Sequence, residues 1–237
     1  DMQITIVRVG TRKGEITLEA AQAMKEAGCV ILHTARCGCA EWLAENAVAF
    51  TALDEIYEQA EDFDAHAELA AARVLNAEAQ SVCYGVLDLA DASVKVLMKS
   101  GKVARVLGGG DAEALLARAA GPVTMMSAMD VENAVIHATQ NTIVREIDSR
   151  ALAGEVKLAL MEHYPEESTA YFLNPDGTIA QCKLCDIDRL KAYDHRCACL
   201  APAIAQLTAL ECYDFEDLMR LVRRLRDPFE GCPWDSK

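Results

Sequence analysis

Three short loops contain the residues best suited to binding a ligand through the backbone. They read "VGTRKGE", "YGVLDLAD" and "LGGGDAE", and each overlaps or follows the end of a strand-like stretch. Ligands often bind at the carboxyl ends of parallel strands, because loop amides and helix N-termini there are free to donate hydrogen bonds. In the third loop, residues 108–110 are all glycine, so the backbone can come close to a ligand without a Cβ in the way. The spacing is not the G-x-G-x-x-G of dinucleotide-binding loops, so the sequence indicates a ligand site without naming the ligand.

The ten cysteines offer a second kind of chemistry, metal binding. Cys182 and Cys185 have the spacing of metal ligands, and His195, Cys197 and Cys199 follow closely enough to complete a zinc site. However, "TIAQCKLCDI" and "RCACLAP" also read as β-strands, in which cysteine serves as a small apolar residue. We favour this second interpretation, with reduced thiols and no metal site.

Nucleophilic catalysis has little support in the sequence. There is no G-x-S-x-G elbow, and no serine or cysteine lies in a context that would activate it. Four of the five histidines are scattered along the chain, and we interpret each as a surface or core residue: His66, His137, His163 and His195. We therefore assign no catalytic residue.

The elements that must position the loops alternate between strands and helices in the first half of the chain. Short loops join them, which predicts a parallel α/β sheet with its loops gathered at one edge. The long acidic helical region is expected to break near Asp62. The predicted strands are residues 4–9, 29–33, 81–86 and 102–107, and the predicted helices are residues 15–28, 40–47 and 55–79.

The second half changes character at Gly121 and Pro122. Strand candidates at residues 122–128, 141–147, 169–174 and 180–187, with an intervening helix at residues 153–165, predict a second α/β subdomain with a mixed sheet and hairpins. "NPDGT" (174–178) is a turn between two strands, and the segment after Pro202 reads as a helical connector. We predict three parts: residues 1–120, residues 121–205 and residues 206–237.

Composition and charge limit the kinds of partner that the chain can bind. The formal net charge of −14 argues against nucleic acid, because phosphate binding needs a surface rich in Lys and Arg. The basic stretch "RLVRRLR" (220–226) reads as the solvated face of a short helix. No apolar run approaches the eighteen or so residues of a membrane span, and the first ten residues do not read as a signal peptide. We therefore expect a cytoplasmic protein that does not bind membranes.

Three stretches carry a resemblance to a known family. "MQITIVRVGTRKGEITLEAAQAMKEAGCVIL" resembles the opening of the tetrapyrrole (corrin and porphyrin) methylases, in which a strand, a G-x-G-P-G-D loop, "L-T-L" and a helix follow in this order. "EVKLALMEHYPEES" and "CKLCDIDRLKAYDHRCACLAP" resemble the variant fused to a MazG-type nucleoside triphosphate pyrophosphohydrolase. The resemblance implies a homodimer of two α/β subdomains with S-adenosylmethionine in the cleft between them.

The resemblance also selects the cofactor-binding residues. Gly10, Gly85 and Gly109 are the positions that keep the glycines of the three family loops, so they are the implied contacts of S-adenosylmethionine. The first loop departs from the family, because residues 11–13 are Thr-Arg-Lys where Pro-Gly-Asp is expected. This removes a fixed φ and a freely permitted positive φ, and it adds two cations near a cationic donor.

A fourth stretch, "RLRDPFEGCPWDSK", resembles the segment that introduces the MazG-type domain. We therefore expect the chain to be a piece that stops where that domain begins. The hydrolase needs magnesium held by clustered carboxylates, and in the family these lie downstream of G-C-P-W-D. Pyrophosphohydrolase activity is not expected of these 237 residues.

Three functions follow from these features. The first is an S-adenosylmethionine-dependent methyltransferase, in which proximity and orientation supply the rate. The second is a non-catalytic methylase-fold module that dimerises or regulates the attached hydrolase, as the altered loops would suggest. The third, a nucleotide-binding protein that uses "GGGD" for phosphate, ranks last because that loop lacks a following Lys, Ser or Thr.

Overall fold

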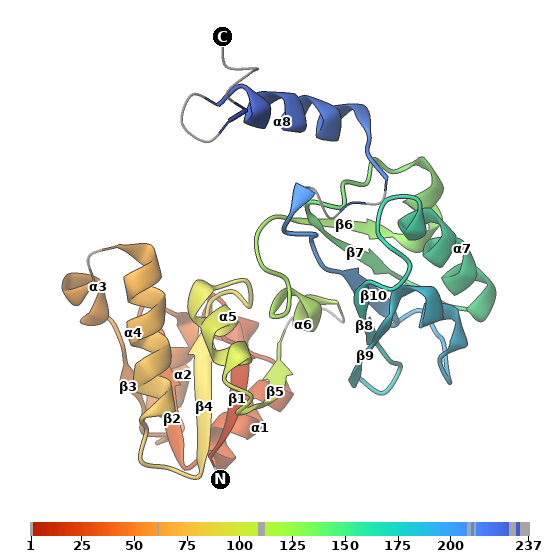
Figure 1. The fold of residues 1–237 in the computed structure, drawn as a ribbon. Coiled ribbons are helices and arrows are strands. Elements are labelled where there is room, and N and C mark those ends of the chain that lie inside the picture. The colour runs from red at the N-terminus through yellow and green to blue at the C-terminus, as the bar shows by residue number, and fades with distance from the viewer. Residues whose placement is uncertain are drawn as a thin grey trace. The chain divides into compact units, whose positions relative to one another are not determined.

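The chain forms two compact units, Asp1–Ala119 and Ala120–Lys237 (Figure 1). The computed structural model describes residues 2–60, 62–108, 112–207, 210, 212–227, 231 and 232. The three-part division at residues 120 and 205 stays a prediction. Within the described ranges none of the helices is both long and apolar enough to cross a membrane.

The first unit is built on a parallel sheet of five strands in the order β3-β2-β4-β1-β5. Its centre is the pair β1 (Gln3–Arg8) and β4 (Ser81–Val86), which align from Gln3 opposite Ser81 to Arg8 opposite Val86. The predicted parallel sheet is confirmed, and because every strand pair is parallel, all carboxyl ends lie at one edge. The remaining strands are β2 (Cys29–Leu32), β3 (Thr51–Ala52) and β5 (Val103–Leu107).

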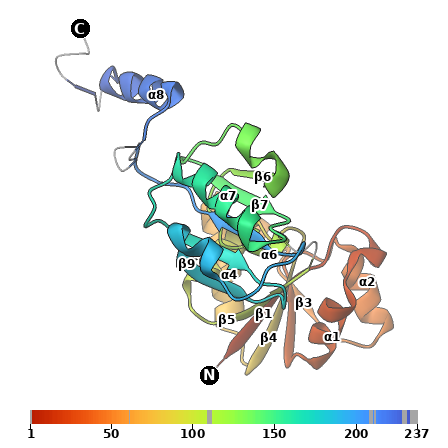
Figure 2. The ribbon, with the colours of Figure 1, turned by 90° about the vertical axis from the view of Figure 1, so that its right-hand side faces the viewer.

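Helices cover both faces of this sheet. Figure 2 shows α1 and α2 on one side of the strands and α4 on the other. Successive strand residues face opposite sides of the sheet and so belong to two different cores. Val7 packs with α1 and α2, whereas Ile6 packs with α4 and α5. The helices are α1 (Leu18–Glu26), α2 (Gly38–Glu45), α3 (Ile56–Gln59), α4 (Phe63–Leu75), α5 (Ala92–Lys99) and α6 (Glu113–Leu116), with a 3₁₀ turn η1 (Lys13–Glu15).

Side-chain caps set where the helices begin. Thr17 accepts a hydrogen bond from the amide of Ala20 at the start of α1, and Asp62 does the same for Ala65 at the start of α4. Such caps satisfy amides that have no partner within the helix. The predicted break of the acidic helical region near Asp62 is confirmed, because α3 ends before this cap and α4 begins after it.

The second unit contains a mixed sheet of five strands in the order β6-β7-β10-β8-β9. β6 and β7 are parallel and the other neighbours are antiparallel, which confirms the predicted mixed sheet. The predicted turn is confirmed too, because the amide of Asn174 donates to Thr178 O at 2.8 Å between β8 and β9. The strands are β6 (Val123–Ser127), β7 (Asn141–Arg145), β8 (Thr169–Leu173), β9 (Ile179–Lys183) and β10 (Ala198–Ala201).

Several predicted ends of elements in the second unit differ from the observed ones; the helix predicted over residues 153–165, for example, spans Arg150–Met161. The strand expected over residues 180–187 ends at Lys183, and a 3₁₀ helix, η3 (Leu184–Arg189), follows. Leu184 and Ile187 are both fully buried, and their spacing of three places them on one side of a helical turn. They pack in the same core as α7 (Arg150–Met161) and the 3₁₀ helix η2 (Ala128–Asn133).

Seven of the ten cysteines lie in the sheets or the cores, whereas Cys212 is exposed. Cys197 and Cys199 are buried at β10, Cys182 is half-buried in β9, and all ten cysteines are free thiols. In the part of the chain that the structure describes, no three histidine, cysteine or carboxylate side chains gather as ligands for one metal ion.

The last described helix is α8 (Phe215–Leu225), within the segment predicted to be helical. Asp214 and Asp217 form a capping box, in which each side chain accepts a hydrogen bond from the backbone amide of the other. Of the stretch "GCPWDSK", only Gly231 and Cys232 lie among the described residues.

Candidate functional site

The arrangement of the first unit selects one place on its loop edge. β1 and β4 are neighbours, but the chain leaves β1 toward α1 on one face of the sheet and leaves β4 toward α5 on the other. In open α/β sheets, ligands bind outside the carboxyl ends of the strands at such a switch point. The candidate site is therefore bounded by the first loop (residues 9–17) and the second loop (residues 87–91).

The first loop is folded around the carboxylate of Glu15. This carboxylate accepts hydrogen bonds from the amides of Thr11 at 2.6 Å and Arg12 at 2.8 Å. The Arg12 amide, its guanidinium and then the Thr11 amide lower the pKa of Glu15 to about 2. Gly10 begins the turn with φ +62°, and a Cβ there would lie 2.5 Å from the Glu15 side chain. Only glycine fits at this predicted cofactor-binding position.

Both cations of the first loop have acidic partners. Arg12 pairs with Glu15 at 2.9 Å, and Lys13 lies 2.6 Å from Glu45 and 3.4 Å from Glu41, both on α2. These pairs offset the repulsion that the sequence suggested between the loop and a cationic donor. Gly38 at the start of α2 permits the contact, because a Cβ there would lie 2.0 Å from the Arg12 carbonyl carbon. No motif around Gly38 pointed to this role.

The second loop offers two carboxylates. Asp88 accepts a hydrogen bond from the amide of Ala90, and Asp91 caps α5 by accepting from the amide of Ser93. Gly85, the predicted contact of this loop, lies inside β4, and a Cβ there would approach the Leu32 side chain to 2.6 Å. Its place in β4 is thus explained by packing, and contact with a cofactor stays a prediction.

The third predicted loop is described only at its two ends. Gly108 has φ +127° and lies against Arg8, where a Cβ would approach the Arg8 Cβ to 2.5 Å. Gly109, the predicted contact, lies outside the described residues. Arg8 lies 3.7 Å from Glu113, which begins α6 after this loop.

Next to the second loop lies a polar network that the sequence did not reveal; its His33, Tyr84 and Ser93 are buried, whereas Tyr57 is 54% exposed. His33 Nδ1 lies 2.7 Å from the hydroxyl of Tyr84, which lies 2.9 Å from Ser93 Oγ. Ser93 Oγ in turn lies 2.5 Å from Asp91 Oδ1, and His33 Nε2 lies 3.2 Å from the hydroxyl of Tyr57. These residues come from four segments of the chain, so only the fold brings them together. A strand ending in histidine was the sole available signal.

Burial governs the protonation of this network. It lowers the pKa of His33, although the carboxylate of Asp91 acts in the opposite direction. It also raises the pKa of Tyr84. Lys95 on α5, whose Nζ donates to the carbonyl of Leu116, has a pKa lowered by burial to about 8 despite the nearby acidic loop residues. The network therefore holds a neutral imidazole and neutral hydroxyls beside the second loop.

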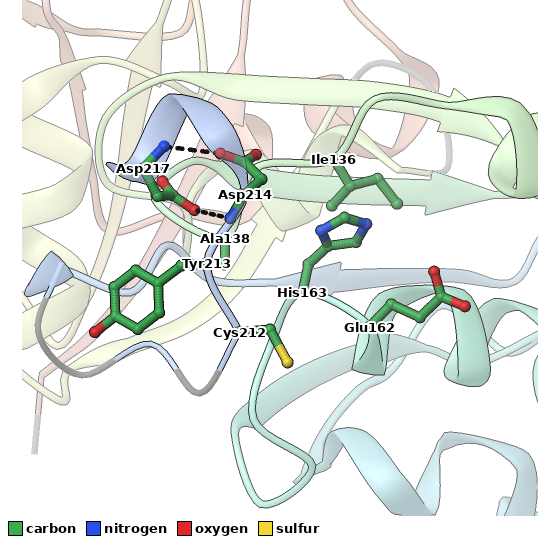
Figure 3. Close-up of a pocket in the computed structure, with 8 residues that line it drawn as sticks. All are labelled: Ile136, Ala138, Glu162, His163, Cys212, Tyr213, Asp214 and Asp217. Atoms are coloured by element: carbon green, nitrogen blue, oxygen red, sulfur yellow. Dashed lines mark hydrogen bonds between the residues drawn. The ribbon is translucent and has the colours of Figure 1, made fainter. Parts of the chain in front are cut away.

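A separate pocket of about 140 Å³ lies in the second unit. Figure 3 shows Asp214 and Asp217 joined by hydrogen bonds at the start of α8 and the ring of His163 beside Ile136. The acidic groups already have protein partners: Asp214 lies 3.1 Å from His137, and Asp217 lies 3.7 Å from Arg220. The pocket is lined by Ile136, Ala138, Glu162, His163, Cys212, Tyr213, Asp214 and Asp217.

The four histidines selected from the sequence do not meet at one site. His66 lies beside His33, with ring centroids 5.1 Å apart, in the first unit. His137 and His163 belong to the region of the second unit around the pocket, and His195 is exposed after η3. His33, which the sequence analysis placed only as the end of a strand, is the histidine nearest the candidate site.

Comparisons with known proteins give one sequence relative. No protein-family model matches the chain. Over 99 residues, or 40% of this chain, it is 30% identical to the uncharacterized protein YabN of Bacillus subtilis strain 168. The matched stretch is 20% of YabN, so the match spans about a fifth of that protein's length.

Several solved structures are similar to most of the chain. Uroporphyrin-III C-methyltransferase from Thermus thermophilus is 14% identical, with 88% of this chain and 97% of that chain covered and a TM-score of 0.35. A diphthine synthase is 9% identical, covering 92% and 93%, with a TM-score of 0.32. A cobalt precorrin-4 methyltransferase is 13% identical, covering 85% and 95%, with a TM-score of 0.31. The names describe the activities of those proteins.

Proposed function

We propose that this chain is an S-adenosylmethionine-dependent methyltransferase of the tetrapyrrole methylase type, with its donor site at the carboxyl edge of the parallel sheet. The observation that carries the proposal is the switch point between β1 and β4, where the first and second loops leave toward opposite faces. The resemblance of residues 2–32 to the opening of the methylases supports the choice of ligand. Gly10, Gly85 and Gly109 remain the proposed contacts.

The charges around the switch point suit a cationic donor. Asp88 and Asp91 place two carboxylates in the second loop, and the cations of the first loop, Arg12 and Lys13, are paired with glutamates. When bound, S-adenosylmethionine would supply an activated methyl group. The residues of the chain would hold donor and acceptor in line, so that orientation accounts for most of the rate.

Calorimetric titration with S-adenosylmethionine and S-adenosylhomocysteine tests this function. We expect saturable binding of both ligands, with one site per chain. Asp88→Asn removes a carboxylate from the second loop, so it should weaken the cationic S-adenosylmethionine more than S-adenosylhomocysteine, which lacks the sulfonium charge. Asp176→Asn, which alters an exposed turn of the second unit, is the control. Absence of heat at millimolar ligand would rule the function out.

One observation favours a second candidate, a methylase-fold module without a donor site. The amides of Thr11 and Arg12 both donate to Glu15, a side chain of the same loop. A ligand carboxylate would have to compete with Glu15 for these amides, so the loop is closed by its own residue.

Glu15→Ala separates the two candidates. If Glu15 stabilises a first loop that binds the donor, the wild type binds S-adenosylhomocysteine and the variant binds it more weakly. If Glu15 closes the loop, the wild type shows no binding and the variant acquires it. Glu19→Ala is the matched control, because Glu19 is exposed on α1 and pairs with Arg105.

We extend the proposal to two partners, both supported by the sequence resemblance. The chain is proposed to form a homodimer, and light scattering coupled to gel filtration should give twice the chain mass. In a longer protein, a MazG-type domain is proposed to follow the stretch "GCPWDSK". That protein should hydrolyse nucleoside triphosphates, and deletion of residues 1–200 should change its assembly or kinetics. A monomeric mass would contradict the homodimer. Unchanged assembly and kinetics after the deletion would contradict the MazG-type partner.

A further inference from the structure

Four side chains form a continuous line of hydrogen bonds that ends in the second loop. His33 follows β2, Tyr84 belongs to β4, Ser93 lies in the first turn of α5, and Asp91 is the cap of α5. The successive distances are 2.7 Å, 2.9 Å and 2.5 Å, all within hydrogen-bond range. Tyr84 and Ser93 are fully buried, so no water competes for these groups.

The chemistry of the groups fixes the direction of each bond. A carboxylate oxygen accepts hydrogen bonds and cannot donate them, so the Ser93 hydroxyl donates to Asp91. Ser93 Oγ can then only accept from Tyr84, which commits the single hydroxyl proton of Tyr84. The Tyr84 oxygen must therefore accept from His33 Nδ1–H.

The directions of these bonds also determine the tautomer of His33. A neutral imidazole has one N–H donor and one acceptor nitrogen, so with Nδ1 protonated, Nε2 accepts from the hydroxyl of Tyr57 at 3.2 Å. All four bonds then point from Tyr57 toward Asp91. Hydrogen bonds in such a series polarise one another in the same direction, which strengthens the last one.

Asp91 connects this series of hydrogen bonds to the backbone of the second loop. Its amide donates to the carbonyl of Asp88 at 3.2 Å, and Asp88 Oδ1 accepts from the amide of Ala90. Because the loop has only five residues, fixing Asp91 at one end and β4 at the other leaves its backbone little freedom.

We propose that Tyr84, with His33 and Ser93, is a positioning residue for the second loop: the one-directional series of hydrogen bonds holds Asp91 and thereby shapes the donor site. The role of the loop in binding the donor rests on the proposed function. The order that the series imposes on the loop backbone does not depend on the proposed function.

A matched pair of variants separates positioning from general stability. Tyr84→Phe removes the hydroxyl that joins His33 to Ser93. Tyr164→Phe removes an equally buried hydroxyl in the second unit, where it bonds Thr142 Oγ1 at 2.9 Å and the carbonyl of Gln140 at 2.6 Å. Each variant loses two hydrogen bonds, so both should lower the melting temperature to a similar degree.

The first measurement is the affinity for S-adenosylhomocysteine. We expect Tyr84→Phe and Ser93→Ala to weaken binding about five- to tenfold, the equivalent of one lost buried hydrogen bond. Tyr164→Phe should leave the affinity within about twofold of the wild type. Equal affinities for the Tyr84 and Tyr164 variants would overturn the proposal.

The second measurement needs no ligand. Amide exchange at Ala90, Asp91 and Ser93 should be about tenfold faster in Tyr84→Phe than in the wild type, and unchanged in Tyr164→Phe. Nitrogen chemical shifts should show His33 protonated on Nδ1. If the wild type binds no S-adenosylhomocysteine, the proposed function fails and the exchange rates alone decide this inference. Unchanged exchange, or protonation of His33 on Nε2, would contradict it.

Discussion

Gly10 shows at the residue scale how the first loop depends on one backbone conformation. Its φ of +62° lies in the left-handed region, and the Glu15 side chain occupies the space that a Cβ would need. Gly10→Ala should therefore lower the free energy of unfolding by about 1–2 kcal/mol. Gly154→Ala in α7 is the control, because nothing lies within 4 Å of its Cβ position. It should raise stability by up to about 1 kcal/mol. Urea unfolding measures both, and equal effects would refute this account of the loop.

His33 links the stability of the protein to pH. Burial lowers its pKa in the folded protein below the ordinary value near 6.5, so folding favours the neutral ring. The contribution is complete above about pH 6.5 and is lost as the pH falls toward the lowered pKa, with a slope of at most about 1.4 kcal/mol per pH unit. The groups facing the ring are His66, Tyr57, Tyr84 and the carboxylates of Asp54 and Asp91.

A variant isolates this dependence. His33→Asn keeps a donor near the position of Nδ1 and cannot titrate, so its melting temperature should change less between pH 7.5 and pH 5.5 than that of the wild type. An equal change in both proteins would assign the pH dependence to other groups.

At the scale of elements, Asp62 determines where α4 begins. Its carboxylate accepts from the amide of Ala65 at 2.8 Å. Asp62→Ala should cost about 1 kcal/mol of unfolding free energy because that amide loses its partner. Asp64 lies in the first turn but is not the cap. Asp64→Ala should therefore cost only a few tenths of a kcal/mol, because it removes only a favourable interaction of the carboxylate with the helix dipole. Chemical denaturation compares the two, and a larger effect at Asp64 would contradict the cap.

The elements also show how far the sequence determines the fold. The break at Asp62, the parallel sheet and the turn at residues 174–178 were predicted because local chemistry specifies them. β3 was not predicted, since its two residues acquire strand geometry only by pairing with β2. The strand over residues 180–187 was predicted too long because the burial of Leu184 and Ile187 in the core of the second unit decides where it ends.

For the candidate site, the positions of the loops could be predicted, but the side-chain contacts beside them could not. Gly10 follows a recognisable strand, so its place at the loop edge was expected. His33 and Tyr84 are 51 residues apart, and their contact depends on β2 and β4 being neighbours in the sheet. Strand order is a property of the whole unit, which the local patterns do not specify.

At the scale of the whole molecule, each unit has its own sheet and its own core. All pairs of the parallel sheet lie within residues 1–119, and all pairs of the mixed sheet lie within residues 120–237. Residues 1–119 alone should therefore fold and give a cooperative thermal transition by circular dichroism. A fragment without a cooperative transition would show that the first unit depends on the second.

We propose a methyl-donor site at the switch point between β1 and β4. Amide chemical shifts of the isotopically labelled chain, followed during titration with S-adenosylhomocysteine, test it most directly. We predict that the largest shifts fall in residues 9–17 and 87–91, on opposite sides of the switch point. Saturating shifts confined to other parts of the chain, or no shifts at millimolar ligand, would contradict the claim.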